Sequence, residues 1–454
     1  MAPAKKMTDY ERKRLDNIRR NGEMMAALSI QAKLSHLSAA IKPKRRVGHN
    51  KKSKTDSSLI VRKSLRVSSN QIAKTRSTNK QEPSFYRGSG SDQSLRHTLL
   101  SLDKESQVGV LVNEGLDVKM EQSDGILSVI EKKEVESCVD LFSSMNLRKE
   151  NAVKFYLPSI SVVKFLPCND VRMIVTGNKG GNVVFWNVDG KVEEGNGLYL
   201  YRHHSGPVSG ISVHQSCLSK IYSSCDYGFV RLMDAEKEVC DLVYTNAEGV
   251  FSVSQQPDNM NVLYFGGGHG KLSIWDERTR KLSSQWNLHE NRINTIDFNS
   301  QNPNIMATSS TDGTACLWDL RNIRPDNPQS LKTISHQRVV HSAYFSPSGS
   351  YLATTSADDT VAILNSANLD ETSRIYHMNK MGVRGIWGWD DSSIFIGNVE
   401  VGVDVISCSQ RTVISTLKSR YMTVTPCTFD AHPYYVGMLA GATRWGHLYI
   451  WAPN

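Results

Sequence analysis

The sequence predicts an all-β protein in which residues 151–454 form a seven-bladed β-propeller, preceded by a basic, partly helical and largely disordered N-terminal arm. Two observations predict the propeller. From about residue 151, short runs of β-branched and aromatic residues alternate with clusters of Gly, Asp, Asn and Ser, the pattern of many short antiparallel strands. A period of just over 40 residues runs through the same region.

The period is read at the end of the third strand of each unit, where a Trp or another apolar residue recurs. These positions are Trp186, Met233, Trp275, Trp318, Leu364, Val405 and Trp451, with spacings of 47, 42, 43, 46, 41 and 46 residues. Such spacings are typical of WD-repeat propellers, in which each four-stranded blade is covered on both faces by its neighbours. We expect a strand from near residues 150–160 to complete the last unit, Met438–Trp451.

One unit contains the full set of residues that marks a WD-repeat blade: His289, Ser310, Asp312 and Trp318. In this family such side chains form a buried hydrogen-bonded set, so we expect a structural role for them. The next unit repeats the scheme with His336, Ser356 and Asp358, but Leu364 replaces the Trp. We also expect the repeated Trp side chains to pack neighbouring blades together, and His289 and His336 not to be general bases. These Trp residues are Trp186, Trp275, Trp318 and Trp451.

The formal net charge of +9 is concentrated in the first 80 residues, which hold 21 Lys and Arg against 5 Asp and Glu. Residues 1–40 predict a basic amphipathic helix, which either docks on a partner or remains a partly helical solvated tail. Residues 41–150 have the composition of a disordered linker, basic at first and then acidic. A basic tail of this kind attracts polyanions such as nucleic acid.

A basic cluster in the linker predicts a nuclear import signal or a nucleic-acid patch, and hence a nuclear protein. It comprises Lys42, Lys44, Arg45, Arg46, Lys51 and Lys52. No run of 18 apolar residues predicts a membrane span, and the eight cysteines form no CxxC pair or compact cluster with histidines. We therefore expect reduced thiols, no metal site and no membrane partner.

No catalytic set stands out in the sequence. GxSxG, a Walker A loop, HExxH and the kinase motifs are all absent. We therefore expect a binding protein that is not an enzyme and requires no cofactor.

Two successive units end in the pattern Trp-Asp-x-Arg, with Asp276 and Arg278 in one and Asp319 and Arg321 in the next. Each Arg can make bidentate bonds to a partner, or it can pair within its own blade. The pattern resembles the double WDxR box of substrate receptors for cullin-4 ubiquitin ligases. The resemblance implies that these four residues bind the ligase adaptor, a propeller protein of the DNA damage-binding protein 1 type.

The opposite face should collect the turns between second and third strands and the connections between blades. Since residues 151–454 are nearly neutral, cations gathered there would create a local positive field, and an exposed Trp could stack on a base. The alternative is a solvated rim with ordinary charges. The candidate DNA contacts are Lys179, Arg292, Arg338, Lys380, Arg384, Arg444 and Trp445, with His203, His204 and Lys271 as further positive or stacking groups.

The chain resembles the family of WD repeat-containing protein 76 and its fungal and plant relatives. The resemblance lies in Tyr10–Asn21, Gly177–Gly181, Cys225–Arg231, Ala343–Pro347 and Leu439–Thr443. That family is described as nuclear and DNA damage-binding, and it is related to the lesion receptor called damage-specific DNA-binding protein 2. The resemblance implies a role for the chain in the damage response and recruitment to a cullin-4 ligase.

By the same resemblance, Lys179 is a phosphate contact and Arg292 lies in a basic connection between blades. The sequence departs from the lesion receptor at His377–Arg384, which has no aromatic wedge to insert into a duplex. That departure puts the flipping of a damaged base in doubt.

Two hypotheses about function follow. In the first, the chain is a nuclear propeller that binds DNA or nucleosomes, damaged or modified DNA in particular, and serves as a cullin-4 substrate receptor. In the second, it is a protein-only scaffold whose rim binds histone tails or other peptides without direct DNA recognition. Under either hypothesis we expect a monomer outside its complexes.

Overall fold

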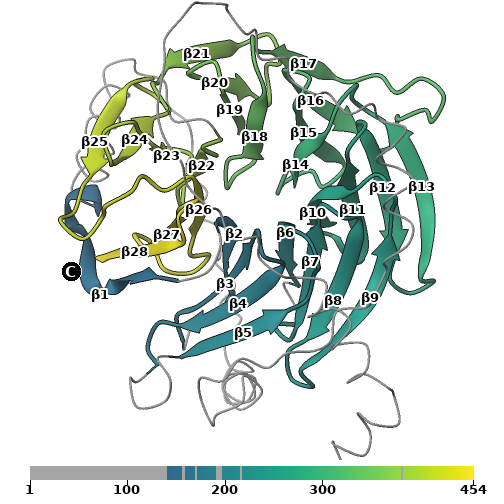
Figure 1. Cartoon of the computed structure of the whole chain (residues 1–454). Coiled ribbons are helices and arrows are strands. Elements are labelled where there is room, and N and C mark those ends of the chain that lie inside the picture. Colours follow the sequence, from purple (N-terminus) through teal and green to yellow (C-terminus); the bar gives the residue numbers. More distant parts are fainter. Residues whose placement is uncertain are drawn as a thin grey trace, which may run out of the picture. The chain divides into compact units, whose positions relative to one another are not determined.

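The computed structural model describes residues 141–155, 159–168, 171–190, 197–214, 217–379 and 382–453. The predicted N-terminal helix, most of the linker, the import cluster and Lys380 lie outside the described residues. Within them, seven four-stranded antiparallel sheets are arranged around one axis (Figure 1). This arrangement confirms the predicted seven-bladed propeller.

Blades 1 to 6 are β2–β5, β6–β9, β10–β13, β14–β17, β18–β21 and β22–β25, and blade 7 combines β26, β27, β28 and β1. The innermost strands are β2 (Ile160–Phe165), β6 (Val208–Val213), β10 (Val250–Gln256), β14 (Ile293–Phe298), β18 (Val340–Phe345), β22 (Ile386–Trp387) and β26 (Thr428–Ala431). The second strands are β3 (Met173–Asn178), β7 (Lys220–Cys225), β11 (Asn259–Gly267), β15 (Ile305–Ser310), β19 (Tyr351–Ser356), β23 (Ser393–Gly397) and β27 (Leu439–Ala442).

The third strands are the ones whose ends carry the repeat. They are β4 (Asn182–Asn187), β8 (Phe229–Asp234), β12 (Lys271–Asp276), β16 (Thr314–Asp319), β20 (Thr360–Asn365), β24 (Val403–Ser407) and β28 (His447–Pro453). The outermost strands are β5 (Leu198–Arg202), β9 (Val239–Thr245), β13 (Lys281–Asn287), β17 (Lys332–Ser335), β21 (Thr372–Tyr376), β25 (Val413–Leu417) and β1 (Met145–Lys154).

The ring is closed by β1, which comes from the start of the described chain and pairs antiparallel with β28 at its end. Leu147 lies opposite Trp451, and both side chains are buried. The strand that completes the last blade therefore begins at Met145, six residues before the boundary at residue 151 that the sequence predicts.

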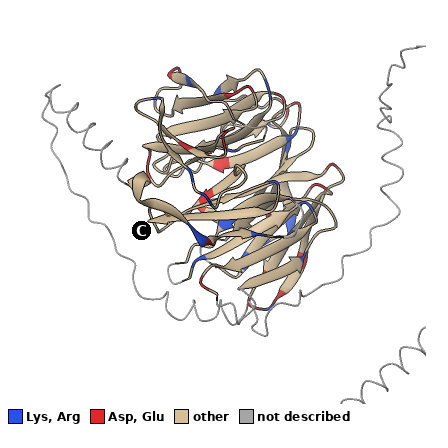
Figure 2. Cartoon of the chain, turned by 60° about the vertical axis from the view of Figure 1, so that its left-hand side comes forward, with Lys and Arg blue, Asp and Glu red and all other residues tan. Residues whose placement is uncertain are grey.

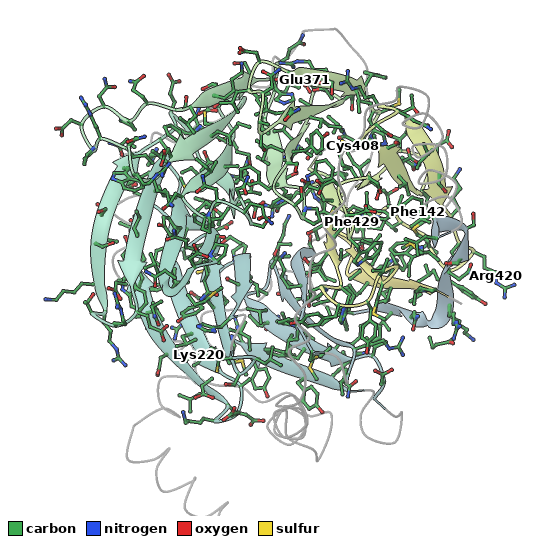
Figure 3. All side chains as sticks on the ribbon, turned by 180° about the vertical axis from the view of Figure 1, so that it is seen from behind. Phe142, Lys220, Glu371, Cys408, Arg420 and Phe429 are labelled. Carbon is green, nitrogen blue, oxygen red and sulfur yellow. The ribbon has the colours of Figure 1, made fainter. Side chains whose placement is uncertain are left out.

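The repeated Trp side chains pack inside the sheet stack, as predicted. Trp186, Trp275, Trp318 and Trp451 are between 1% and 5% exposed. The largest core cluster extends over blades 5 to 7 and includes Phe142 and Phe429 (Figure 3). Phe142 meets Phe395 edge to face at 5.7 Å between ring centroids, so the residues just before β1 also hold the last blades together.

A hydrogen-bonded network in blade 4 corrects one sequence prediction. His289 and Trp318 both bind the hydroxyl of Thr308, at 2.7 and 2.8 Å, while the other ring nitrogen of His289 lies 3.0 Å from Asp312. Ser310, the predicted hydroxyl, instead donates to the carbonyl of Asn291. Side chains alternate in direction along a strand, so Thr308 and Ser310 share a face of β15, but it is the Thr308 hydroxyl that bonds to both rings.

The innermost strands are joined by side chains that cap the next blade's backbone. Asp297 accepts from the N–H of Phe345 and Asp430 from that of Phe165, each at 2.8 Å. Asp430 also pairs with Lys164 at 2.7 Å, which links the first blade to the last. Burial alone would lower the pKa of Lys164, but the neighbouring Asp430 carboxylate raises it above the usual value.

The described residues contain no helix long and apolar enough to cross a membrane. All cysteines among them are free thiols: Cys168, Cys217, Cys225, Cys240, Cys316, Cys408 and Cys427. In the same part of the chain, no group of three His, Cys, Asp or Glu side chains is arranged to hold a metal ion.

Candidate functional site

The propeller has two faces that differ in their loops. We call the upper face the one that carries the turns between second and third strands and the connections between blades. The lower face carries the turns between first and second strands and between third and fourth strands. Lys and Arg are interspersed with Asp and Glu over the blades (Figure 2). A functional surface must therefore come from local arrangement and not from the total charge.

On the upper face, the turn between β27 and β28 presents Arg444 and Trp445 to solvent. Thr443 accepts hydrogen bonds through its hydroxyl from the N–H groups of Trp445 and His447, at 3.2 and 2.9 Å. Gly446 completes the turn at a φ of +80°, a conformation that residues with a side chain rarely adopt. The Trp445 side chain is consequently 73% exposed.

Three arginines converge on His341, which lies in the innermost strand β18. Arg292 directly precedes β14, Arg384 lies just before β22, and Arg444 comes from the last blade. Burial, followed by the positive fields of Arg384, Arg444 and Arg292, lowers the pKa of His341 to about 4. His341 is therefore neutral near pH 7, and the group formed by these three arginines and His341, here called the arginine group, has a charge of +3.

The arginines of this group differ in how they are engaged. Arg292 donates to the Asn294 side chain at 2.9 Å, and its guanidinium lies 5.0 Å from the centroid of the Phe251 ring. Asp226 lies near Arg292 and Lys179, and burial raises its pKa although both cations act to lower it. By contrast, Arg384 and Arg444 form no ion pair with a carboxylate in the part of the chain that the structure describes.

Gly382 allows Arg444 to approach the connection between blades 5 and 6. A Cβ atom at Gly382 would overlap the Arg444 guanidinium, and the residue has a φ of +79°. The N–H of Gly382 donates to Nε2 of His341 at 3.0 Å. The backbone of Arg384 is held by a 2.9 Å hydrogen bond from its N–H to the carbonyl of Cys427 in blade 7. The connection between blades 5 and 6 is thus held by His341 of blade 5 and by Cys427 of blade 7.

The other predicted upper-face residues lie apart from the arginine group or are engaged elsewhere. Lys179 and Arg338 are exposed, and Lys271 pairs with Glu248 at 3.6 Å. The prediction that His203 and His204 are rim groups was wrong. Both side chains are buried, and burial lowers the pKa of His203 to about 3 and that of His204 well below its usual value. Their ring nitrogens belong to the interior, where His204 contacts Ser223 at 2.9 Å.

On the lower face, the two WDxR arginines each form an ion pair within their own blade. Nε and Nη2 of Arg321 donate to the two oxygens of Asp319 at 2.9 and 2.7 Å. Arg278 holds Asp276 in the same way, at 3.3 and 3.2 Å. The arginine hydrogen bonds lower the pKa of both carboxyl groups, so the pairs remain ionised.

Pairing within the blade still leaves the arginines accessible. Their side chains are 66% and 61% exposed, and they come from adjacent blades, 3 and 4. The intervening Glu277 pairs with Lys220 of blade 2 at 2.9 Å. Each guanidinium is therefore held in a fixed direction at the lower face, with donors that are not used by its aspartate.

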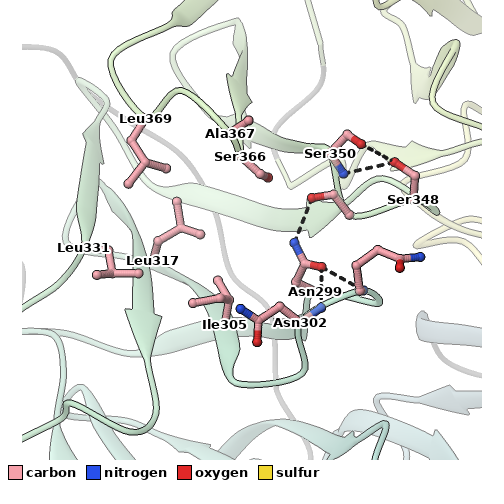
Figure 4. Close-up of a pocket in the computed structure, with 12 residues that line it drawn as sticks. Asn299, Asn302, Ile305, Leu317, Leu331, Ser348, Ser350, Ser366, Ala367 and Leu369 are labelled. Atoms are coloured by element: carbon pink, nitrogen blue, oxygen red, sulfur yellow. Dashed lines mark hydrogen bonds between the residues drawn. The ribbon is translucent and has the colours of Figure 1, made fainter.

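A small pocket lies on the same face, between blades 4 and 5 (Figure 4). Leu317, Leu331 and Leu369 form its apolar side, and Leu331 is 46% exposed. At the other end, the Asn299 side chain donates to the carbonyl of Gly349 at 2.7 Å, which ties blade 4 to blade 5. The pocket contains no charged side chain among its lining residues.

Sequence reasoning missed three members of the upper-face arrangement: His341, Gly382 and Phe251. His341 and Phe251 lie within strands, so their residue types alone suggest ordinary blade packing. The sequence gives no signal for the contact between Gly382 and Arg444, because these residues are 62 positions apart in the chain. Only the closure of the ring brings them together.

Comparison with known proteins agrees with the repeat pattern. The family model described as "WD domain, G-beta repeat" matches residues 280–319 and 328–365, which cover the outermost strand of blade 3, all four strands of blade 4 and the first three strands of blade 5. Among curated proteins, WD repeat-containing protein 76 of Xenopus laevis is 24% identical over 86% of this chain and 70% of its own length. The chain carries WD repeats and is similar to WD repeat-containing protein 76.

Two fungal proteins named DNA damage-binding protein CMR1 are similar to the same degree. The one from Neurospora crassa is 24% identical over 99% of this chain and 100% of its own length. The one from Scheffersomyces stipitis is 26% identical over 71% of each chain. The family resemblance noted in the sequence is thereby confirmed.

Proposed function

We propose that this WD-repeat protein is a nuclear, non-enzymatic binding protein that binds DNA or chromatin through its upper face and acts in the DNA damage response. The observation that carries the proposal is the arginine group, a charge of +3 in which Arg384 and Arg444 have no carboxylate partner among the described residues. Arg292 lies near the Asp226 carboxylate, but the like charges of Arg384 and Arg444 favour binding of a polyanion that neutralises them. The names of the fungal relatives, DNA damage-binding protein CMR1, support the same ligand.

The physical mechanism is the displacement of counterions from the phosphate backbone. Each phosphate that an arginine neutralises releases condensed cations, so affinity falls as salt concentration rises. Backbone contacts of this kind position a protein on DNA but carry no sequence information. We therefore expect weak sequence preference, with the basic residues of positions 1–80 adding to the affinity.

The test is a titration of labelled duplex DNA with the full chain over a series of salt concentrations. The double variant Arg384→Glu/Arg444→Glu should bind more weakly. The slope of log affinity against log salt is negative, and it should become shallower by about 2. The variant Lys179→Glu/Arg292→Glu should also weaken binding. Lys281→Glu is the control for reversing a charge elsewhere on the propeller, since it reverses one exposed cation on the outer strand β13, whereas each double variant reverses two.

One result would exclude the upper face as the DNA site. If both upper-face variants bind as tightly as the wild type, while removal of residues 1–80 abolishes binding, then the arm alone binds DNA.

A second activity is favoured by the lower face. The exposed, oriented guanidinium groups of Arg278 and Arg321 support recruitment of this chain to a cullin-4 ligase through its propeller adaptor. Arg278→Ala/Arg321→Ala should abolish co-precipitation of the adaptor from nuclease-treated extract. Arg172→Ala is the control, because Arg172 forms a similar pair with Asp189 on the lower face of blade 1. Retention of the adaptor by the double variant would contradict this assignment.

A further inference from the structure

The adjacency of Arg444 and Trp445 distinguishes this part of the upper face from an ordinary basic rim. The two residues are consecutive in one short turn, and both side chains are exposed. The indole, which is 73% exposed, offers a flat apolar surface, and the guanidinium of the preceding residue lies against Gly382. A nucleotide offers the complementary pair of groups, a base and a phosphate.

Arg384 and His341 extend this surface toward the propeller axis. His341 accepts the Gly382 N–H through Nε2, so its neutral ring carries its proton on Nδ1 as a hydrogen-bond donor. Arg384 is half-buried beside it, and its backbone is fixed by Cys427. The site thus combines guanidinium donors with a neutral donor, and three blades hold these groups.

We propose, building on the DNA-binding function above, that Arg384, Arg444 and Trp445 bind an unpaired nucleotide of DNA, with its phosphate on the two arginines and its base stacked on the indole. The choice of an unpaired nucleotide follows from the aromatic ring. In a continuous duplex both faces of each base are covered by neighbouring base pairs, so no face is open to a side chain that sits beside the backbone. A single strand, a gap or a frayed end exposes that face.

The contacts of Arg292 agree with this assignment, in which Arg384 and Arg444 bind the phosphate and Trp445 stacks on the base. Its guanidinium already covers the Phe251 ring and binds Asn294, so it supplies positive field to the site from a fixed position. The Trp445 ring has no such cation over it among the described residues. Of these two aromatic side chains, Trp445 is therefore the one with a face open to a base.

The experiment compares binding of the full chain to labelled oligothymidine and to a blunt duplex of equal length, by fluorescence anisotropy at fixed salt. Trp445→Ala should weaken oligothymidine binding at least about fivefold, the lower end of what base–aromatic stacking supplies, and change duplex binding by less than about twofold. Arg384→Glu/Arg444→Glu should weaken both, and oligothymidine more. Trp445→Phe, which retains an aromatic face, should recover most of the affinity lost in Trp445→Ala. Lys281→Glu is the charge control.

A second readout does not depend on affinity. Saturating oligothymidine should quench part of the tryptophan fluorescence of the wild type, and this component should be missing in Trp445→Phe. If Trp445→Ala binds oligothymidine like the wild type, or the quenching persists in Trp445→Phe, the unpaired-nucleotide site is refuted. Duplex binding that remains sensitive to the arginines would then leave the DNA-binding function intact. Failure to bind either DNA would refute both.

Discussion

Thr308 lies in the middle of blade 4, where its hydroxyl bridges two rings from different parts of the chain. Since Nδ1 of His289 faces the Asp312 carboxylate, that nitrogen carries the proton, and Nε2 accepts from Thr308. Thr308 in turn accepts from the Trp318 indole. One fully buried oxygen therefore satisfies two polar groups that have no access to water.

Replacing Thr308 by Val should destabilise the propeller by about 1–3 kcal/mol, because the shape is kept while two buried polar groups lose their partner. Thr354→Val in blade 5 is the matched comparison. There the hydroxyl binds His336 at 2.9 Å, but Leu364 stands in place of the Trp, so only one such group is left unsatisfied. Chemical denaturation should give the larger loss for Thr308→Val. Equal losses would show that the Trp hydrogen bond contributes nothing.

The imidazole of His432 makes the stability of the propeller depend on pH. Its side chain is fully buried, and Nδ1 accepts the N–H groups of Tyr434 and Tyr435 at 3.2 and 3.1 Å. Burial lowers its pKa from 6.5 to about 4, so the unfolded chain takes up a proton first as the pH falls. The free energy of unfolding should therefore decrease between about pH 6.5 and pH 4, by at most about 1.4 kcal/mol per pH unit for this group.

The variant His432→Asn tests this, since an Asn oxygen can accept the same N–H groups but cannot titrate. Urea unfolding at several pH values should show a shallower loss of stability below pH 6.5 than in the wild type. Asp297→Asn should have the opposite effect. Burial raises the pKa of Asp297 to about 6, so its protonation favours the folded state as the pH falls and partly offsets the histidines.

The role of a residue could be predicted from the sequence where its side chain makes its contacts within its own repeat. The Trp positions and the histidines of blades 4 and 5 could be identified because the repeat fixes their surroundings. Thr308 could not be separated from Ser310, since both are small hydroxyl residues on the same face of one strand. His203 and His204 were wrongly predicted to lie at the rim. Their side chains are buried, and the burial of a side chain depends on the neighbouring blades, which the residues next to it in the sequence do not reveal.

At the scale of the element, β1 is the strand that the sequence locates least well. Its residues, MNLRKENAVK, include three exposed charged positions in succession, Arg148, Lys149 and Glu150. As the outermost strand of blade 7, it pairs on one side only, and a bulge between Leu147 and Ala152 interrupts the alternation of apolar and polar residues. These features resemble a linker, which is why the predicted boundary lay inside the strand.

Leu147→Ala should nevertheless destabilise the propeller by about 2–4 kcal/mol, because the side chain is 6% exposed and packs in the cluster shared by blades 5 to 7. Arg148→Ala, one position along and exposed, should be close to neutral. The thermal unfolding midpoint of the full chain measures both. A neutral Leu147→Ala would mean that β1 detaches without cost and that the Lys164–Asp430 pair and the remaining strands close the ring alone.

At the scale of the whole molecule, ring closure gives the chain two surfaces from loops that alternate along the sequence. The period of the sequence predicts this division, because every unit contributes loops to both faces. It could not predict which cations would meet. Arg292, Arg384 and Arg444 converge on His341 only because blades 4 to 7 follow the curvature of the ring. By contrast, Lys271 forms an ion pair with Glu248.

The two faces should bind their partners independently. The sheets between the arginine group and the WDxR arginines are packed and hydrogen-bonded throughout, with no described element that offers a second arrangement for one ligand to select. Adaptor binding should therefore change the dissociation constant for DNA by less than about twofold, and Arg278→Ala/Arg321→Ala should leave DNA affinity unchanged. Titrating DNA into the chain with and without saturating adaptor measures this coupling. A tenfold change, which corresponds to about 1.4 kcal/mol, would require a conformational link across the blades that their packing does not provide.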